Sequence, residues 1–267
     1  MRVAPRWWIG ILVWIAYVIV IFTVGLLSGV PYDQYGDSGD TLFRAPVLFL
    51  AAGAVLLVIA TSVLGWWKPA LRDERRSRHA WPIIAPGLMA VTIVISLTAG
   101  VDWSGIDGGY LAGLLLLGAL VGFNEELVTR GILLTSLRGT VREVWVWFTT
   151  SALFGLMHAT NLFFGQELLP TLQQIGLAFL GGTGFYIVRR VTGSLIWAML
   201  LHGAWDFTTF AVGHAPGAAG IGLMLGTVAE VLALVFVFWT FRSKGEDAAT
   251  AEPSVGAART STGSATP

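Results

Sequence analysis

Long runs of apolar residues organise the chain, and each run is about as long as a helix that crosses a bilayer. A hydrocarbon core of about 30 Å corresponds to roughly 20 helical residues. Charged residues, glycine or proline separate eight such runs: Trp7–Val30, Thr41–Trp67, Pro82–Gly100, Gly109–Leu137, Val144–Phe164, Leu168–Val188, Ser194–Val212 and Ala218–Phe241. The pattern predicts an all-α fold, a polytopic membrane helical bundle of about eight transmembrane helices.

The first run follows two arginines, as a secretory signal does, but it is too long for one and lacks an A-x-A cleavage site. We therefore interpret it as an uncleaved span. The sequence has no evident internal repeat or second domain. It divides into three N-terminal helices (residues 1–108), a core of four helices (109–212), a last helix (213–242) and a tail (243–267) that is rich in small polar residues and expected to be disordered.

The basic residues predict an orientation, because alternating spans place every second loop on the same side. With two exceptions, Arg44 and Arg130, all Lys and Arg residues fall on one side: Arg2, Arg6, Lys68, Arg72, Arg75, Arg76, Arg78, Arg138, Arg142, Arg189, Arg190, Arg242, Lys244 and Arg259. The opposite loops carry Asp33, Asp37, Asp40, Asp102, Asp107 and Glu167. We expect a multi-pass protein of the cell membrane with both termini in the cytoplasm.

Composition agrees with a chain whose main partner is the lipid bilayer. Of its 267 residues, 55% are hydrophobic and 12% are charged, and the mean hydropathy is +0.73, a balance outside that of ordinary soluble domains. A formal net charge of zero gives no support for a nucleic-acid partner. The absence of cysteine excludes disulfides, thiolate metal sites and cysteine nucleophiles.

Six ionisable residues form three clusters inside predicted spans, where each charge costs at least about 2.5 kcal/mol unless it has a partner or a task. The rise along a helix places the acidic residues and the histidines among them roughly 12–21 Å from the cytoplasmic end of their spans. Three helices thus bring ionisable groups to one layer, which predicts a shared polar cavity. These residues are Glu125, Glu126 and Arg130 in the fourth span, His158 in the fifth, and His202 and Asp206 in the seventh.

Helical spacing separates the two glutamates. Glu126 and Arg130 are four residues apart and share a face, whereas Glu125 points about 100° away. We expect Glu126 to pair with Arg130, which leaves Glu125 available to act on a water molecule or a substrate. His202 and Asp206 are also four residues apart and can present a second polar face to the same cavity.

Each of these features also has a purely structural interpretation. A single histidine in a membrane helix is often only hydrogen-bonded to a neighbour, and an E-x-x-x-R pair is often a structural ion pair. Glu230, isolated in the last span, fits a structural role or a subunit contact. The number, shared depth and chemical variety of the other residues favour a functional site, in which Phe154, one turn before His158, restricts the imidazole ring.

The same segments resemble the CPBP family of intramembrane proteases, which includes type II CAAX prenyl endopeptidases, abortive-infection proteins and lysostaphin-resistance-protein-A-like proteins. The family pattern is E-E-x-x-x-R, then F-x-x-x-H, then H-x-x-x-N/D on successive helices. This chain has all three motifs in that order, and the similarity runs from about Leu111 to Phe210. The motif residues are Glu125, Glu126, Arg130, Phe154, His158, His202 and Asp206.

The resemblance implies an endopeptidase that hydrolyses a peptide bond in a membrane-associated or lipidated protein or peptide. Glu125 and His158 would activate the attacking water, and His202 with Asp206 would polarise the carbonyl or hold the oxyanion. Two positions depart from the pattern: Thr129 stands where the family usually has an aromatic residue, and Asp206 stands where prenyl endopeptidases more often have Asn. An ionised Asp cannot donate a hydrogen bond, which weakens its oxyanion role.

The sequence leaves open whether the site uses a metal ion and whether the protein is an enzyme. The family was long labelled metalloprotease, and zinc is possible with Glu125, His158 and His202 as ligands, but we favour a glutamate-type mechanism without a cofactor because no H-E-x-x-H motif is present. A non-enzymatic scaffold or immunity-type protein is the alternative from another class. A proton-coupled transporter is a weaker one, since the sequence shows neither repeated halves nor broken helices.

Overall fold

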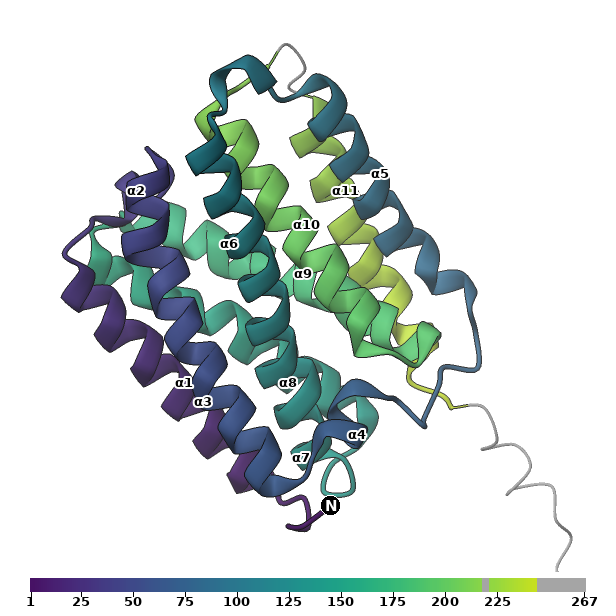
Figure 1. The fold of residues 1–267 in the computed structure, drawn as a ribbon. Coiled ribbons are helices and arrows are strands. Elements are labelled where there is room, and N and C mark those ends of the chain that lie inside the picture. Colours follow the sequence, from purple (N-terminus) through teal and green to yellow (C-terminus); the bar gives the residue numbers. More distant parts are fainter. Residues whose placement is uncertain (218–220, 244–267) are drawn as a thin grey trace, which may run out of the picture.

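Helices build the part of the chain that the computed structural model describes, residues 1–217 and 221–243 (Figure 1). No β-strand forms in these residues, which confirms the all-α fold. The α-helices are α1 (Trp7–Ser28), α2 (Gly39–Leu42), α3 (Leu48–Leu64), α4 (Trp67–Leu71), α5 (Ile84–Ala99), α6 (Gly108–Glu126), α7 (Leu134–Leu137), α8 (Glu143–Met157), α9 (Leu168–Thr192), α10 (Leu195–His214) and α11 (Ile221–Phe236).

Two of the long helical segments contain π-helical turns. A π-helical segment, Phe43–Val47, joins α2 to α3 and contains Pro46, which has no backbone N–H for the regular ladder. A second, Leu127–Leu133, joins α6 to α7. Such turns often occur at functional sites, and this one begins directly after Glu126.

Five helical segments within the described ranges are long and apolar enough to cross a membrane: Trp7–Ser28, Gly39–Leu64, Trp81–Ala99, Gly108–Leu137 and Leu195–His214. They confirm the membrane bundle. The three other expected spans correspond to α8 with the 3₁₀ segment after it, to α9, and to α11 with its own 3₁₀ extension, and their crossing of the membrane stays a prediction. The predicted disorder of the tail concerns residues that, except for Ser243, lie outside the described part.

The helices α6 and α10 cross at the centre of the bundle (Figure 1), and glycines bring their backbones together. A Cβ atom added at Gly118 would lie 2.7 Å from the carbonyl oxygen of Gly203, and one added at Gly122 would collide with the carbonyl oxygen of Met199. Small residues permit this approach between membrane helices. The crossing therefore places the end of α6, including Glu126, against the middle of α10.

The loops rich in Lys and Arg lie together at one end of the bundle. The backbone N–H of Arg2 donates to Leu64 O at 3.1 Å, and that of Ser77 donates to Arg190 O at 2.7 Å. Arg78 N donates in the same way to the carbonyl oxygen of Arg242 at 2.9 Å. The N-terminus, α4 and α7 lie together at this end (Figure 1). The loops that carry the described basic residues, Arg44 and Arg130 excepted, thus lie at one end as expected, while Lys244 and Arg259 lie outside the described part. The compartment that this end faces stays a prediction.

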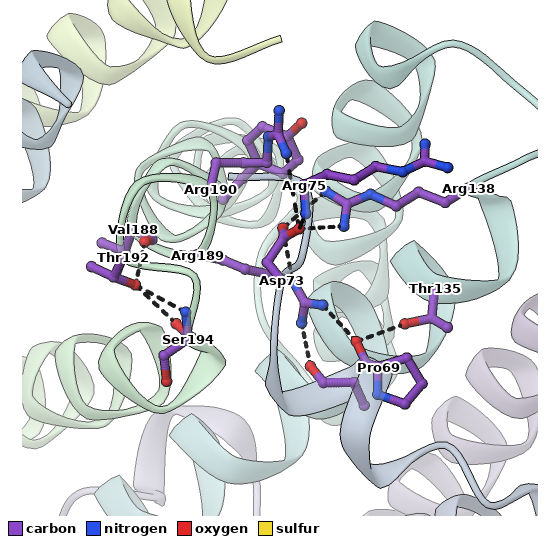
Figure 2. A network of polar contacts seen from close by, with 12 residues as sticks. Pro69, Asp73, Arg75, Thr135, Arg138, Val188, Arg189, Arg190, Thr192 and Ser194 are labelled. Atoms are coloured by element: carbon purple, nitrogen blue, oxygen red, sulfur yellow. Dashed lines mark hydrogen bonds and ion pairs between the residues drawn. The ribbon is translucent and has the colours of Figure 1, made fainter. Parts of the chain in front are cut away.

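An ionic network ties this basic end together (Figure 2). Asp73 accepts two hydrogen bonds from Arg138, at 2.8 and 2.9 Å, and lies 3.5 Å from the guanidinium of Arg189. Arg138 also pairs with Glu143 at 2.6 Å, and Arg190 lies 3.7 Å from the same carboxylate. Burial alone would raise the pKa of Asp73, but the arginines outweigh burial and lower it.

Candidate active site

Glu126 is the centre of a fully buried polar cluster. Its Oε1 atom accepts a hydrogen bond from Arg130 Nη1 at 2.9 Å, and both side chains are completely buried. The pair expected from the four-residue spacing is therefore present. The same oxygen lies 3.1 Å from Nδ1 of His202, a contact between helices that the sequence did not indicate. Glu126 thus links the α6 motif to the α10 motif.

Arg130 is held by aromatic and small residues as well as by its carboxylate. Its guanidinium lies 4.3 Å from the ring centroid of Phe154, a favourable cation–π geometry. Gly182 of α9 makes room for both groups, because an added Cβ atom would collide with the guanidinium and lie 2.8 Å from the Phe154 ring. Thr129 accepts a hydrogen bond from Arg130 Nη1 at 3.0 Å and donates one to the backbone carbonyl of Glu125. The Thr129 hydroxyl, at the position where the family usually has an aromatic residue, therefore helps to hold Arg130 and the π-helical segment in place.

Glu125 faces a different side of the helix from Glu126. Its side chain is 13% exposed and lines a small cavity together with His158 and Asp206. One carboxylate oxygen lies 3.9 Å from Nε2 of His202, too far for a direct hydrogen bond. Glu125 is thus close to the polar cluster but directed at the cavity.

His158 stands where α8 gives way to a 3₁₀ segment, His158–Phe164. The continuous helix expected over 144–164 is thus wrong beyond Met157. Nδ1 of His158 donates to the carbonyl oxygen of Phe154 at 3.1 Å. With its proton on Nδ1, the neutral ring keeps a lone pair on Nε2. The ring of Phe154 meets the imidazole edge to face, with centroids 5.5 Å apart, and so restricts it as expected.

His202 is fixed by rings from two other helices. Phe185 of α9 stacks on the imidazole with centroids 4.4 Å apart, and Phe154 contacts it edge to face at 5.3 Å. Nε2 of His202 lies 3.8 Å from Oδ2 of Asp206. Sequence reasoning missed Phe185, which is one of many apolar residues in its span. The only signal near it is the glycine-rich stretch 181–184, which indicates a close approach to α9.

The segment that contains these residues is similar to a known protein family. Residues 107–208 match the family described as type II CAAX prenyl endopeptidase Rce1-like. By this similarity, residues 107–208 are called the Rce1-like domain. The match confirms the resemblance carried by the motifs. No curated protein matches the chain.

The Rce1-like domain contains every candidate site residue, and two adjoining cavities bring the reactive ones together. The smaller cavity, of about 110 Å³, is lined by Glu125, His158 and Asp206. The larger, of about 400 Å³, is lined by His158, His202 and Asp206 and extends to Glu230 of α11. His158 and Asp206 line both cavities. The helices α6, α10 and α11 and the 3₁₀ segment after α8 thus contribute ionisable groups to two cavities that share part of their walls.

The same geometry tests whether the Rce1-like domain is arranged to hold a metal ion. Within the described ranges, no three His, Asp or Glu side chains are grouped as a ligand set. Nδ1 of His158 is turned to a backbone carbonyl and Nδ1 of His202 to Glu126. Glu125, His158 and His202 are therefore not grouped as a ligand set, although Nδ1 contacts of this kind also occur in metal-binding histidines. Metal dependence stays a prediction, and we derive no step through a metal.

Proposed function

We propose that the protein is an intramembrane endopeptidase that hydrolyses a peptide bond in a membrane-associated or lipidated protein or peptide. One observation carries the proposal: Glu125 and His158, from different helical segments, line the same cavity beside His202 and Asp206. They do so inside an Rce1-like domain, whose family is typically proteolytic.

Glu125 and His158 are the groups proposed to activate water. The Glu125 carboxylate can accept a proton from a water molecule in the small cavity, and the free Nε2 lone pair of His158 can accept a hydrogen bond from the same molecule. Two positioned acceptors orient a water oxygen toward a carbonyl carbon, and the proton taken by the carboxylate is then available for the leaving amine. This division of work needs only side chains already beside the cavity.

His202 is the proposed donor to the carbonyl oxygen. Because its Nδ1 is directed at Glu126, Nε2 can donate only when the ring carries both protons. As an imidazolium, it would lie among the carboxylates of Glu126, Glu125 and Asp206, at 3.1, 3.9 and 3.8 Å, and would stabilise negative charge that develops on the substrate oxygen. Asp206 has a lesser part here, since an ionised carboxylate cannot donate a hydrogen bond.

Comparison of cleavage products tests the proposal without a known substrate. Membranes containing wild-type protein or Glu125→Gln are analysed by proteomics of new protein termini, and purified enzyme is then assayed on peptides spanning those sites. Glu125→Gln and His158→Ala should abolish turnover with an unchanged melting temperature. His202→Ala should lower kcat by about 10²–10³, as for loss of one oxyanion donor, and Asp206→Asn should be tolerated. Identical termini in all samples would instead favour a scaffold.

Metal analysis of the pure, active enzyme tests the absence of a cofactor from the proposed mechanism. Activity should persist after chelation and dialysis, with a substoichiometric zinc content. Stoichiometric zinc that is lost together with activity on chelation, and restored with it on readdition, would make Glu125, His158 and His202 ligands and overturn the assigned roles.

A further inference from the structure

Glu230 is a carboxylate that the proposed mechanism does not use, although it lines the same cavity as the catalytic histidines. It lies on α11, beyond the segment that matches the Rce1-like family. Its residue is 5% exposed, and it lines the larger cavity with His158, His202 and Asp206. It therefore belongs to the catalytic cavity, which the sequence did not indicate.

Glu230 does not belong to the outward surface of α11. On that helix, Val228 and Val231 are 54% and 47% exposed, so they form part of the outward face. Glu230 instead faces α9, where a Cβ atom added at Gly181 would lie 3.3 Å from its Oε1 atom. A subunit contact through Glu230 does not fit this placement.

The other carboxylates of the site each lie within ion-pair distance of a basic group, and Glu230 does not. Glu126 pairs with Arg130 at 2.9 Å, and Glu125 and Asp206 lie 3.9 and 3.8 Å from His202. Across residues 1–217 and 221–243, no group forms a hydrogen bond or ion pair with the side-chain carboxylate of Glu230. A carboxylate without a partner at membrane depth is costly. A molecule bound in the cavity is therefore the best source of a partner for the Glu230 carboxylate.

We propose that Glu230 is a specificity residue that binds a cationic nitrogen of the substrate, supplied by a Lys or Arg side chain close to the scissile bond. This inference rests on the proposed function, because it assumes that a peptide lies in the larger cavity. A peptide whose scissile carbonyl is beside His202 has its flanking residues within this cavity, of about 400 Å³, on whose wall Glu230 is placed. A carboxylate at such a site favours substrates with a cationic side chain, because every other side chain leaves the carboxylate without an ion-pair partner.

The experiment uses binding, so that it does not depend on turnover. The full-length protein carrying Glu125→Gln is reconstituted in nanodiscs. Its affinity is measured for an apolar peptide, blocked at both ends, with one central Lys, and for a matched peptide with norleucine at that position. The Lys peptide should bind about tenfold more tightly, as expected for a buried charge pair. Adding Glu230→Gln should reduce this ratio to about one, whereas Gln173→Ala, a change on the same cavity wall, should preserve it.

The outcomes separate the two proposals. An unchanged Lys preference in Glu230→Gln, or an equal loss of affinity for both peptides, overturns the role of Glu230. A lysine-free peptide with an unblocked N-terminus tests the other source of a cationic nitrogen, and a Glu230-dependent preference for that peptide alone would overturn the assignment to Lys or Arg. If wild-type enzyme cleaves no peptide, the proposed function fails, but the binding ratio still decides whether Glu230 recognises a cation.

Discussion

Glu126 shows how a residue outside the reacting groups can organise the candidate site. One of its oxygens contacts both Arg130 and Nδ1 of His202. The first contact partly neutralises a carboxylate that would otherwise be an isolated charge in the membrane, and the second fixes which nitrogen of His202 faces the cavity. Phe154 packs against Arg130 and His202 at the same time. The orientation of His202 thus depends on a buried ion pair.

Arg130→Ala should destabilise the protein by about 3–5 kcal/mol, because it leaves the buried Glu126 carboxylate without its cation. Thermal unfolding in detergent measures the effect. Arg44→Ala is a matched control, since Arg44 also pairs with an acid four residues away but both side chains are largely exposed. That change should cost no more than about 0.5 kcal/mol. If Arg130→Ala melts together with the wild type, the ion pair has no structural role.

At the scale of elements, the crossing of α6 with α10 determines the distance between the two glutamates and His202. Gly122 is three residues before Glu125, and its backbone lies against Met199, which is three residues before His202. If α6 and α10 move apart at this point, the distance between the glutamates and His202 increases too, because these residues lie within one turn of it. The adjacent glycines Gly181 and Gly182 act in a similar way on α9, where they make room for Glu230 and Arg130.

Gly122→Ala should therefore lower both stability and turnover. The added methyl group would collide with the Met199 carbonyl oxygen, and overpacking of this kind costs about 1–3 kcal/mol. Gly87→Ala is the control, because a Cβ atom at Gly87 of α5 would meet no atom within 4 Å. It should be neutral or slightly stabilising through its better helix propensity. Equal melting temperatures and equal kcat for the two variants would contradict a close helix crossing as the basis of the site.

At the scale of the whole molecule, the network around Asp73 joins segments that are far apart in the chain. Asp73 and Arg138 connect the loop after α4 to the end of α7, Glu143 begins α8, and Arg190 is near the end of α9. Arg190 also donates to the carbonyl oxygen of Thr240 at 2.8 Å, which ties in the segment after α11. The basic residues at this end are therefore partly structural and not only determinants of orientation.

This network should make stability fall in acid. Burial alone would raise the pKa of Asp73 and of Glu143, but Arg138 and its neighbours lower both below their ordinary values. A carboxyl with a lower pKa in the folded state stabilises fully above its unfolded pKa of about 4, and this contribution is lost as the pH falls through the folded pKa. The melting temperature should thus decrease below about pH 4. Asp73→Asn should be destabilised by about 3–5 kcal/mol at pH 7 and show a smaller decrease in acid. A variant with the wild-type pH profile would contradict this role of the network.

Orientation can be measured on this cysteine-free chain. A cysteine at Glu74, whose side chain is 81% exposed at the basic end, should react with a membrane-impermeant thiol reagent only after the cells are opened. A cysteine at Ser104, exposed at the opposite end, should react in intact cells. Ser77 lies at the basic end too but is only 2% exposed, so it is a poor labelling position. The reverse labelling pattern would invert the predicted orientation.

Local spacing and hydropathy were enough to predict the helical membrane bundle, the Glu126–Arg130 pair and the contact of Phe154 with His158. The bundle follows from the length of the apolar runs. The two pairs follow from residues a helical turn apart, whose relation is the same in any helix. Only the tertiary structure decided that His202 contacts Glu126, that Phe185 stacks on His202, that Asp73 joins the basic loops and that Glu230 faces the cavity. These contacts depend on how different helices are rotated and crossed, which is set by the close approach of their backbones at a few glycines. The periodicity of a single helix contains no information about that arrangement.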